Sequence, residues 1–136
     1  MAKAKSIAKS DFVQRNLEAG LEKLAVAATA GAHALAVRVR DGKKLTVTVK
    51  RLAKRRASLL KRKTLAAKRA TKSPDGDTRK ALGSAVRELA ATTKLLGKAR
   101  ASKSENATEL AALKLASRRA TGYARAIAQI DRSLRT

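Results

Sequence analysis

The sequence contains no cysteine and no tryptophan, and its only histidine is His33. A chain without cysteine has no disulfide, no thiolate nucleophile and no thiolate metal ligand. A single histidine cannot supply the paired imidazoles on which many zinc sites depend. We also recognise no glycine-rich phosphate loop and no pair of catalytic carboxylates. We therefore expect neither an enzyme nor a protein with a bound cofactor or metal.

Aromatic residues are almost absent, since Phe12 and Tyr123 are the only two. Stacking on single-stranded bases depends on exposed aromatic rings, so the chain has little equipment for binding unpaired nucleic acid. Asparagine and glutamine, which read base edges in duplexes, are few and scattered. Tyr123 lies at helical spacing within an apolar series, and we expect it to be a core residue. The composition therefore predicts no sequence-specific readout.

Long hydrophobic runs are also missing. The longest run, 24–37, has 14 residues and includes a histidine, a glycine and a threonine, so it is too short and too polar to span a bilayer. No apolar stretch of the secretory type follows Met1, and we do not expect secretion. The expected location is the cytoplasm, a nucleoid or the interior of a virus particle.

Acidic residues are scarce, and the charge balance is extreme. The chain has 33 lysines and arginines against 10 acids, which gives a formal net charge of +23. Alanine supplies 30 of the hydrophobic residues, so each helix can bury only a narrow apolar stripe. We expect a marginal monomer that a second copy or a polyanion helps to stabilise. In its richness in alanine and lysine the chain resembles linker histones and basic bacterial nucleoid proteins, in composition only.

Helical periodicity dominates most of the sequence. Asp11 and Gln14 have the spacing of a capping box, and Gly31 is a candidate helix stop. Turn-forming residues at 73–77 separate a second helix, at about 51–71, from a third, and Ser102 with Glu105 is typical of the start of a fourth. The predicted apolar faces of the first, third and fourth helices are Val13, Leu17, Leu21, Leu24 and Ala28; Leu82, Val86, Leu89, Thr93 and Leu96; and Leu113, Ala116, Ala120, Tyr123, Ile127, Ile130 and Leu134.

Apolar residues alternate with polar ones on both sides of Asp41-Gly42, which is typical of a β-hairpin. A three-residue loop would place Val39 opposite Leu45 and keep one face apolar, whereas a two-residue loop would mix the faces. The sequence therefore predicts a mainly α protein. We expect a mobile basic arm at 1–10 and a single domain at 11–136, with an N-terminal helix, one β-hairpin at about 34–50 and three antiparallel helices.

The basic residues concentrate in the middle of the chain, where residues 51–100 have 16 bases and three acids. On the predicted helix at 51–71, most of them fall within roughly 140° of arc on a helical wheel. Nucleic-acid phosphates need only cations at a surface, so such a stripe favours binding to a phosphate backbone. A merely solvated face is the alternative, but solvated faces normally mix signs. The stripe consists of Arg51, Lys54, Arg55, Lys61, Arg62, Lys68, Arg69 and Lys72.

Two further sets of cations have several interpretations. The polar face of the hairpin could straddle a nucleic-acid groove, although an ordinary solvated sheet face is the simpler interpretation. Arg56 and Lys63 interrupt the apolar side of the helix, where they extend along the packed face to solvent, pair with Glu88 or Glu109, or mark a face that packs only in part. The cations of the hairpin face are Arg38, Arg40, Lys44 and Lys50.

The leading functional hypothesis is sequence-independent nucleic-acid binding, in DNA packaging or in the architecture of a nucleoid or virion. Duplex DNA is the favoured partner and a second copy is a further candidate. One alternative is a structural RNA-binding protein of a ribonucleoprotein particle. An alternative of another class is a coat or assembly protein that binds an anionic surface or an acidic protein.

Overall fold

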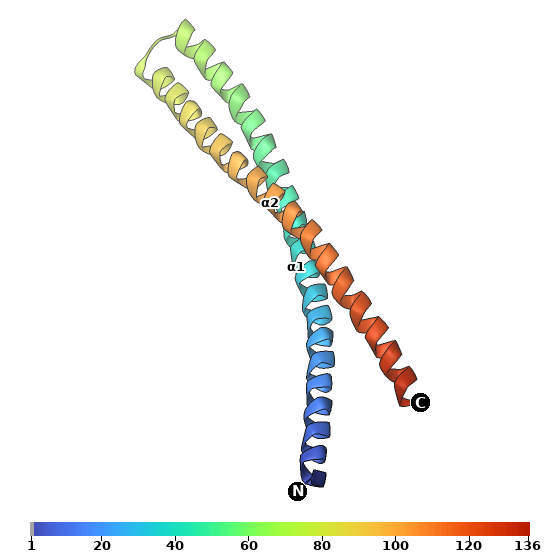
Figure 1. Cartoon of the computed structure of the whole chain (residues 1–136). Helices are drawn as coiled ribbons and strands as arrows, with labels where there is room; N and C mark the ends of the chain where they lie inside the picture. Colours follow the sequence, from blue (N-terminus) through green and yellow to red (C-terminus); the bar gives the residue numbers. More distant parts are fainter. Residues whose placement is uncertain (1) are drawn as a thin grey trace. The chain divides into compact units, whose positions relative to one another are not determined.

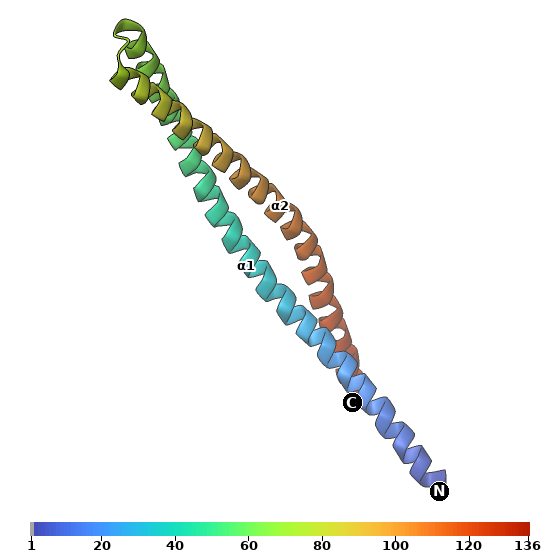
Figure 2. The same cartoon turned by 90° about the vertical axis from the view of Figure 1, so that its left-hand side faces the viewer.

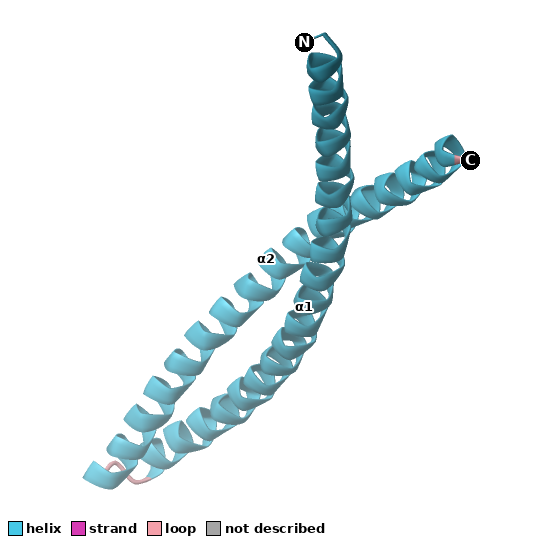
Figure 3. Ribbon diagram, turned by 90° about the horizontal axis from the view of Figure 1, so that it is seen from below, coloured by secondary structure: helices cyan, strands magenta, loops and turns pink. Residues whose placement is uncertain are grey.

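Two long α-helices form nearly all of the structure, a computed structural model that describes the backbone of residues 2–136 and the side chains of 9–136. Helix α1 comprises Ala2–Lys72 and helix α2 comprises Gly76–Arg135 (Figure 1). No strand occurs in residues 2–136 (Figure 3). The expected fold is therefore wrong in two respects, because the hairpin at 34–50 is helical and the four expected helices are two.

The helices pack through a seam, which we define as the positions that recur at alternating steps of three and four residues. All of them are buried or half-buried except Arg56, Lys103 and Ile127. On α1 the seam comprises Leu21, Leu24, Ala28, Gly31, Leu35, Arg38, Gly42, Leu45, Val49, Leu52, Arg56, Leu59, Lys63, Ala66 and Ala70. On α2 it comprises Leu82, Ala85, Leu89, Thr92, Leu96, Ala99, Lys103, Asn106, Leu110, Leu113, Ser117, Ala120, Ala124, Ile127 and Asp131.

The seam explains why residues 34–50 are helical although their apolar residues alternate. Leu35, Leu45 and Val49 continue the heptad spacing of the flanking residues and are half-buried, whereas Val37 and Val47 are exposed. The threonines that suggested a strand are accommodated in the helix, since Thr46 and Thr48 donate hydrogen bonds to carbonyls four residues earlier, at 2.9 and 3.0 Å. Continuous packing therefore outweighs the modest helix propensity of valine and threonine.

The chain divides into two compact units. Unit 1 comprises Met1–Val39 with Glu109–Thr136, and unit 2 comprises Arg40–Thr108. In each unit α1 and α2 lie side by side and antiparallel (Figure 2). The expected arm at 1–10 falls mainly on residues whose side chains lie outside the described part of the chain. Its backbone is helical from Ala2, and its mobility stays a prediction, as does the single domain at 11–136.

The hydrophobic core lies in unit 2. Among residues 9–136, the buried hydrophobic side chains are Leu52, Leu59, Ala66, Ala85 and Leu96, and all five belong to that unit. Among the residues of unit 1 whose side chains the structure describes, Ser117 alone is buried. Several residues of the predicted apolar faces are instead exposed, because the seam uses their neighbours. Ala85 replaces Val86, Thr92 replaces Thr93, and Val13 and Ile130 lie at the surface. Leu17 is in line with the seam, four residues before Leu21, but is also exposed.

Two glycines that suggested breaks in the chain are instead sites of close helix contact. A methyl group on Gly31 would lie 3.1 Å from the hydroxyl of Ser117 in unit 1, and one on Gly42 would lie 3.1 Å from the amide nitrogen of Asn106 in unit 2. No described glycine has a positive φ. Gly31 therefore does not end a helix, and Gly42 does not form a turn.

These contacts predict different changes in the free energy of unfolding for two Gly→Ala substitutions in unit 1. Gly122 has no neighbour within 4 Å of an added methyl group, so Gly122→Ala is expected to raise the free energy of unfolding by about 1 kcal/mol through helix propensity alone. Gly31→Ala is expected to lose most or all of that gain, because the helices must separate. Chemical denaturation of both variants measures the difference, and equal gains would contradict the close approach.

The predicted turn is present at 73–75, and Asp75 caps α2. The Thr78 amide donates to Asp75 Oδ1 at 2.8 Å, while the Asp75 amide donates to the Thr78 hydroxyl at 3.1 Å. This reciprocal pair has the geometry of a capping box. The Thr78 amide hydrogen bond is the largest of the effects that lower the pKa of Asp75 below its ordinary value.

A lowered pKa in the folded state gives stability that is present at neutral pH and is lost as the pH falls through that pKa. Asp75→Asn can still accept the cap hydrogen bond but has no charge to titrate. We therefore expect its melting temperature to fall less between neutral and acidic pH than that of the wild type. Thermal melts followed by circular dichroism test this, and parallel losses in the two proteins would contradict it.

Candidate nucleic-acid interface

A row of cations follows α1 through unit 2 on the side opposite the seam. Its members are exposed and recur at steps of three and four residues, with gaps at Val47, Ser58 and Leu65. Three arginines at steps of seven lie along one edge of the row. We call this surface the basic face, and it comprises Arg40, Lys44, Arg51, Lys54, Lys61, Lys68 and Lys72, with Arg55, Arg62 and Arg69 at its edge.

The structure unites two sets of residues that the sequence assigned to different elements. Because residues 40–50 are helical, Arg40 and Lys44 continue the row formed by residues 51–72. Lys50 is exposed beside the row. Arg38 does not belong to the basic face, since it is half-buried in unit 1 and donates to Glu109 Oε2 at 3.0 Å. The expected β-ribbon is thus wrong, whereas three of its four cations lie on or beside the basic face.

The basic face has almost no internal neutralisation. Between Asp41 and Asp75 the sequence has thirteen bases and no acid. Within residues 9–136, Arg62 is the only member of the face in an ion pair, with Glu88 at 3.3 Å. Both side chains are largely exposed, and exposed pairs of this kind are weak. The charge of the face is therefore available to an external anion.

The two cations in the seam differ in their surroundings. Arg56 is exposed, and its Nε donates to the Thr93 hydroxyl at 3.3 Å. Lys63 is half-buried and lines a surface hollow of about 760 Å³ beside Leu60 and Ala67. Neither forms an ion pair with Glu88 or Glu109, because those acids pair with Arg62 and Arg38. The exposure of Arg56 agrees with a side chain that extends along the seam to solvent.

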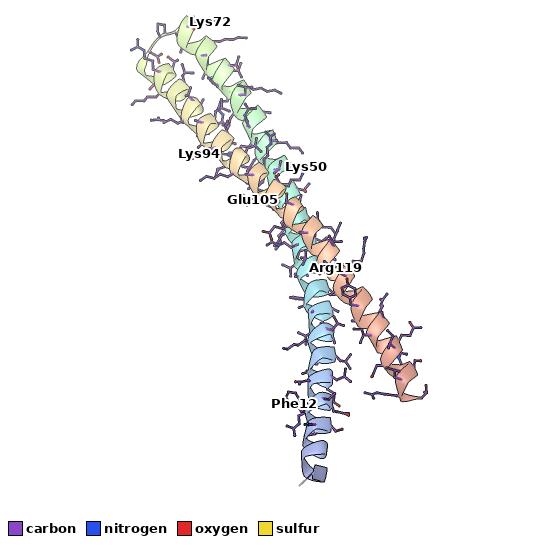
Figure 4. All side chains as sticks on the ribbon, viewed as in Figure 1. Phe12, Lys50, Lys72, Lys94, Glu105 and Arg119 are labelled. Carbon is purple, nitrogen blue, oxygen red and sulfur yellow. The ribbon has the colours of Figure 1, made fainter. Side chains whose placement is uncertain are left out.

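Helix α2 adds cations that the sequence did not single out. Lys80, Arg87 and Lys94 recur every seven residues and are exposed. Lys94 on α2 and Lys50 on α1 project away from the ribbon (Figure 4). The sequence contains this seven-residue repeat, but acids also occur along α2, so its cations did not stand out as one row. Cations therefore line both helices of unit 2.

The face is long enough to follow a nucleic-acid backbone. Residues 40–72 form a helical segment of about 50 Å at 1.5 Å per residue. Successive cations of the row are separated by one or two helical turns, about 5 or about 10.5 Å along the axis. Such an array of flexible cations fits phosphate groups, which are recognised by charge without regard to base sequence.

The part of the chain that the structure describes shows no cluster of metal ligands and no apolar stretch that could cross a membrane. Among residues 9–136, no three acids or histidines come together as metal ligands. Neither helix, over the residues described, contains an apolar stretch of the length that a bilayer requires. Tyr123, expected in the core, is 51% exposed in unit 1, with the Arg119 guanidinium 5.8 Å from the centre of its ring.

Comparison with protein-family models, curated proteins and solved structures finds no match to this chain.

Proposed function

We propose that this protein binds the phosphate backbone of nucleic acid through the basic face, without reading its sequence, and so packages or organises DNA. The observation that carries the proposal is the acid-free run of thirteen bases on α1, nine of which lie on the exposed basic face. Unit 2 as a whole has 21 bases and five acids. An unbalanced charge of this size attracts polyanions over a range set by the salt concentration.

Duplex DNA is the favoured form of nucleic acid. Neither aromatic residue lies in unit 2, so the basic face has no ring on which an unpaired base could stack. Phosphates of duplex DNA follow one another at about 1.7 Å of helix axis, which offers several partners to each turn of α1. Duplex RNA presents similar charges, and direct competition between the two duplexes decides between them.

Titration of a fluorescent duplex with the protein at increasing salt tests the function. With six to ten phosphate contacts, affinity is expected to fall by about 10³–10⁵ between 50 and 200 mM salt. Two duplexes of unrelated sequence and equal length are expected to bind within a few-fold of each other. An affinity independent of salt, or a preference of about 10³ for one sequence, would reject backbone binding.

A further inference from the structure

Unit 1 differs from unit 2 in charge and in packing. It has twelve bases and five acids, a net charge of +7, whereas unit 2 has a net charge of +16. Among its described residues no hydrophobic side chain is buried, although both helices continue the heptad seam. The seam of unit 1 therefore has the pattern of a helical core without the burial.

One flank of unit 1 is open. A hollow of about 240 Å³ lies between the helices, lined by Leu21 and Ala25 of α1 and by Ile127 and Ala128 of α2. A second hollow, of about 560 Å³, is lined by residues of both helices that include Leu35 and Thr121. Ala25 comes directly after the seam residue Leu24, and Ala128 comes directly after the seam residue Ile127. In an antiparallel pair these equivalent positions lie on the same side of the seam, so both helices contribute to one flank. We call this surface the open flank of unit 1.

We propose that the open flank of unit 1 is a dimer interface, occupied by the same flank of a second copy of this chain. The two helices of each copy would then form a four-helix arrangement through unit 1. On α1 the flank presents mainly small side chains, Ala25, Thr29, Ala32 and Ala36, which permit close approach of another helix. The proposal does not depend on nucleic-acid binding.

The flank has acids on one helix and arginines on the other, so it is complementary in charge to the same flank of a second copy. Glu18 and Glu22 lie there on α1, and Arg118, Arg125 and Arg132 lie there at steps of seven on α2. Within residues 9–136 none of these five side chains forms an ion pair, although Glu18 accepts a hydrogen bond from Gln14. If the two-fold axis of the pair is parallel to the helices, α1 of each copy meets α2 of the other, and the acids of one copy face the arginines of its partner.

The exposed surface of the chain is large enough to include an interface. The chain exposes 10864 Å². A standard interface removes about 800 Å² from each partner. Each copy offers two segments of about twenty residues, about 30 Å each, which is sufficient length for an interface of that size.

Sedimentation of the nuclease-treated wild-type chain, at tens of micromolar and physiological salt, tests the proposal without any variant. The expected mass is twice 14.5 kDa. A monomer under these conditions would overturn the dimer and leave the proposed function intact. A dimer that forms only after nucleic acid is added would also overturn it, because the flank would then not be sufficient.

Charge reversal tests whether the open flank forms the contact. One variant carries Glu18→Arg and Glu22→Arg, and the other carries Arg125→Glu and Arg132→Glu. Each variant alone would place like charges across the interface and is expected to sediment as a monomer. An equimolar mixture restores both opposite-charge contacts and is expected to form a dimer.

Mixing separates contacts between chains from contacts within one chain, because a defect inside a single copy is not corrected by its partner. Circular dichroism establishes that both variants remain helical, as the similar helix propensities of Glu and Arg predict. Folded variants that stay monomeric when mixed, or that dimerise as well alone as together, would overturn the assignment of the flank. If a variant fails to fold, the wild-type mass still decides whether the dimer exists.

Discussion

Replacing Lys54, Lys61 and Lys68 with glutamine is expected to lower the dependence of log affinity on log salt by about 2–3 units. The three lysines lie at steps of seven in the middle of the basic face and are all exposed. Each phosphate contact that is lost removes about 0.9 from this slope on duplex DNA. Glutamine is nearly as good a helix former as lysine, so the helix should remain intact.

The matched control removes three cations from unit 1, through Lys9→Gln, Lys23→Gln and Arg119→Gln. These side chains are also exposed, and the loss of net charge is the same. If the basic face is the site, the control should change the slope by much less than the first triple. Equal losses in the two folded variants would show that total charge governs binding and that the face is not a defined site.

Leu59→Ala is expected to destabilise the protein by about 2–5 kcal/mol, the usual cost of removing a buried leucine. Leu59 is 3% exposed and is one of only three buried leucines among the described residues. Domains of ordinary size have about 5–15 kcal/mol of stability in total, so this single change would remove a large share. The loss should be large because few other side chains close the same seam.

The neighbouring residue supplies the control. Leu60 is 46% exposed, and Leu60→Ala is expected to cost less than about 1 kcal/mol, since alanine is the better helix former and little area is buried. Urea denaturation followed by circular dichroism compares the two variants. Similar costs would mean that the two helices do not pack through the seam described here.

The mainly helical character, the turn near Pro74 and the position of α1 cations could be predicted from the sequence. The hairpin could not be excluded by local pattern, since Leu35, Val37 and Val39 fit a period of two, and only Leu35 of the three lies on the heptad seam. Whether residues 34–50 form a strand pair or a helix depends on their contacts with residues of α2, which are distant in sequence. Gly31 and Gly42 suggested breaks until Ser117 and Asn106 placed them in close helix contact.

The row of cations was easier to predict than the fold, because it depends only on local helix geometry. The error at 34–50 hid its full length, since Arg40 and Lys44 were assigned to a strand. The role of Arg38 depends on Glu109, 71 residues later, and no local pattern could reveal that pair. The division of α1 between two units also depends on long-range contacts.

Lysine acylation in the presence and absence of duplex DNA, followed by mass spectrometry, tests most directly whether the basic face binds nucleic acid. DNA is expected to protect the lysines of the face, which are Lys44, Lys54, Lys61, Lys68 and Lys72. Lys9 and Lys23 are exposed in unit 1, away from both the basic face and the open flank, and should keep their reactivity. Uniform protection of both groups, or protection confined to unit 1, would contradict the account.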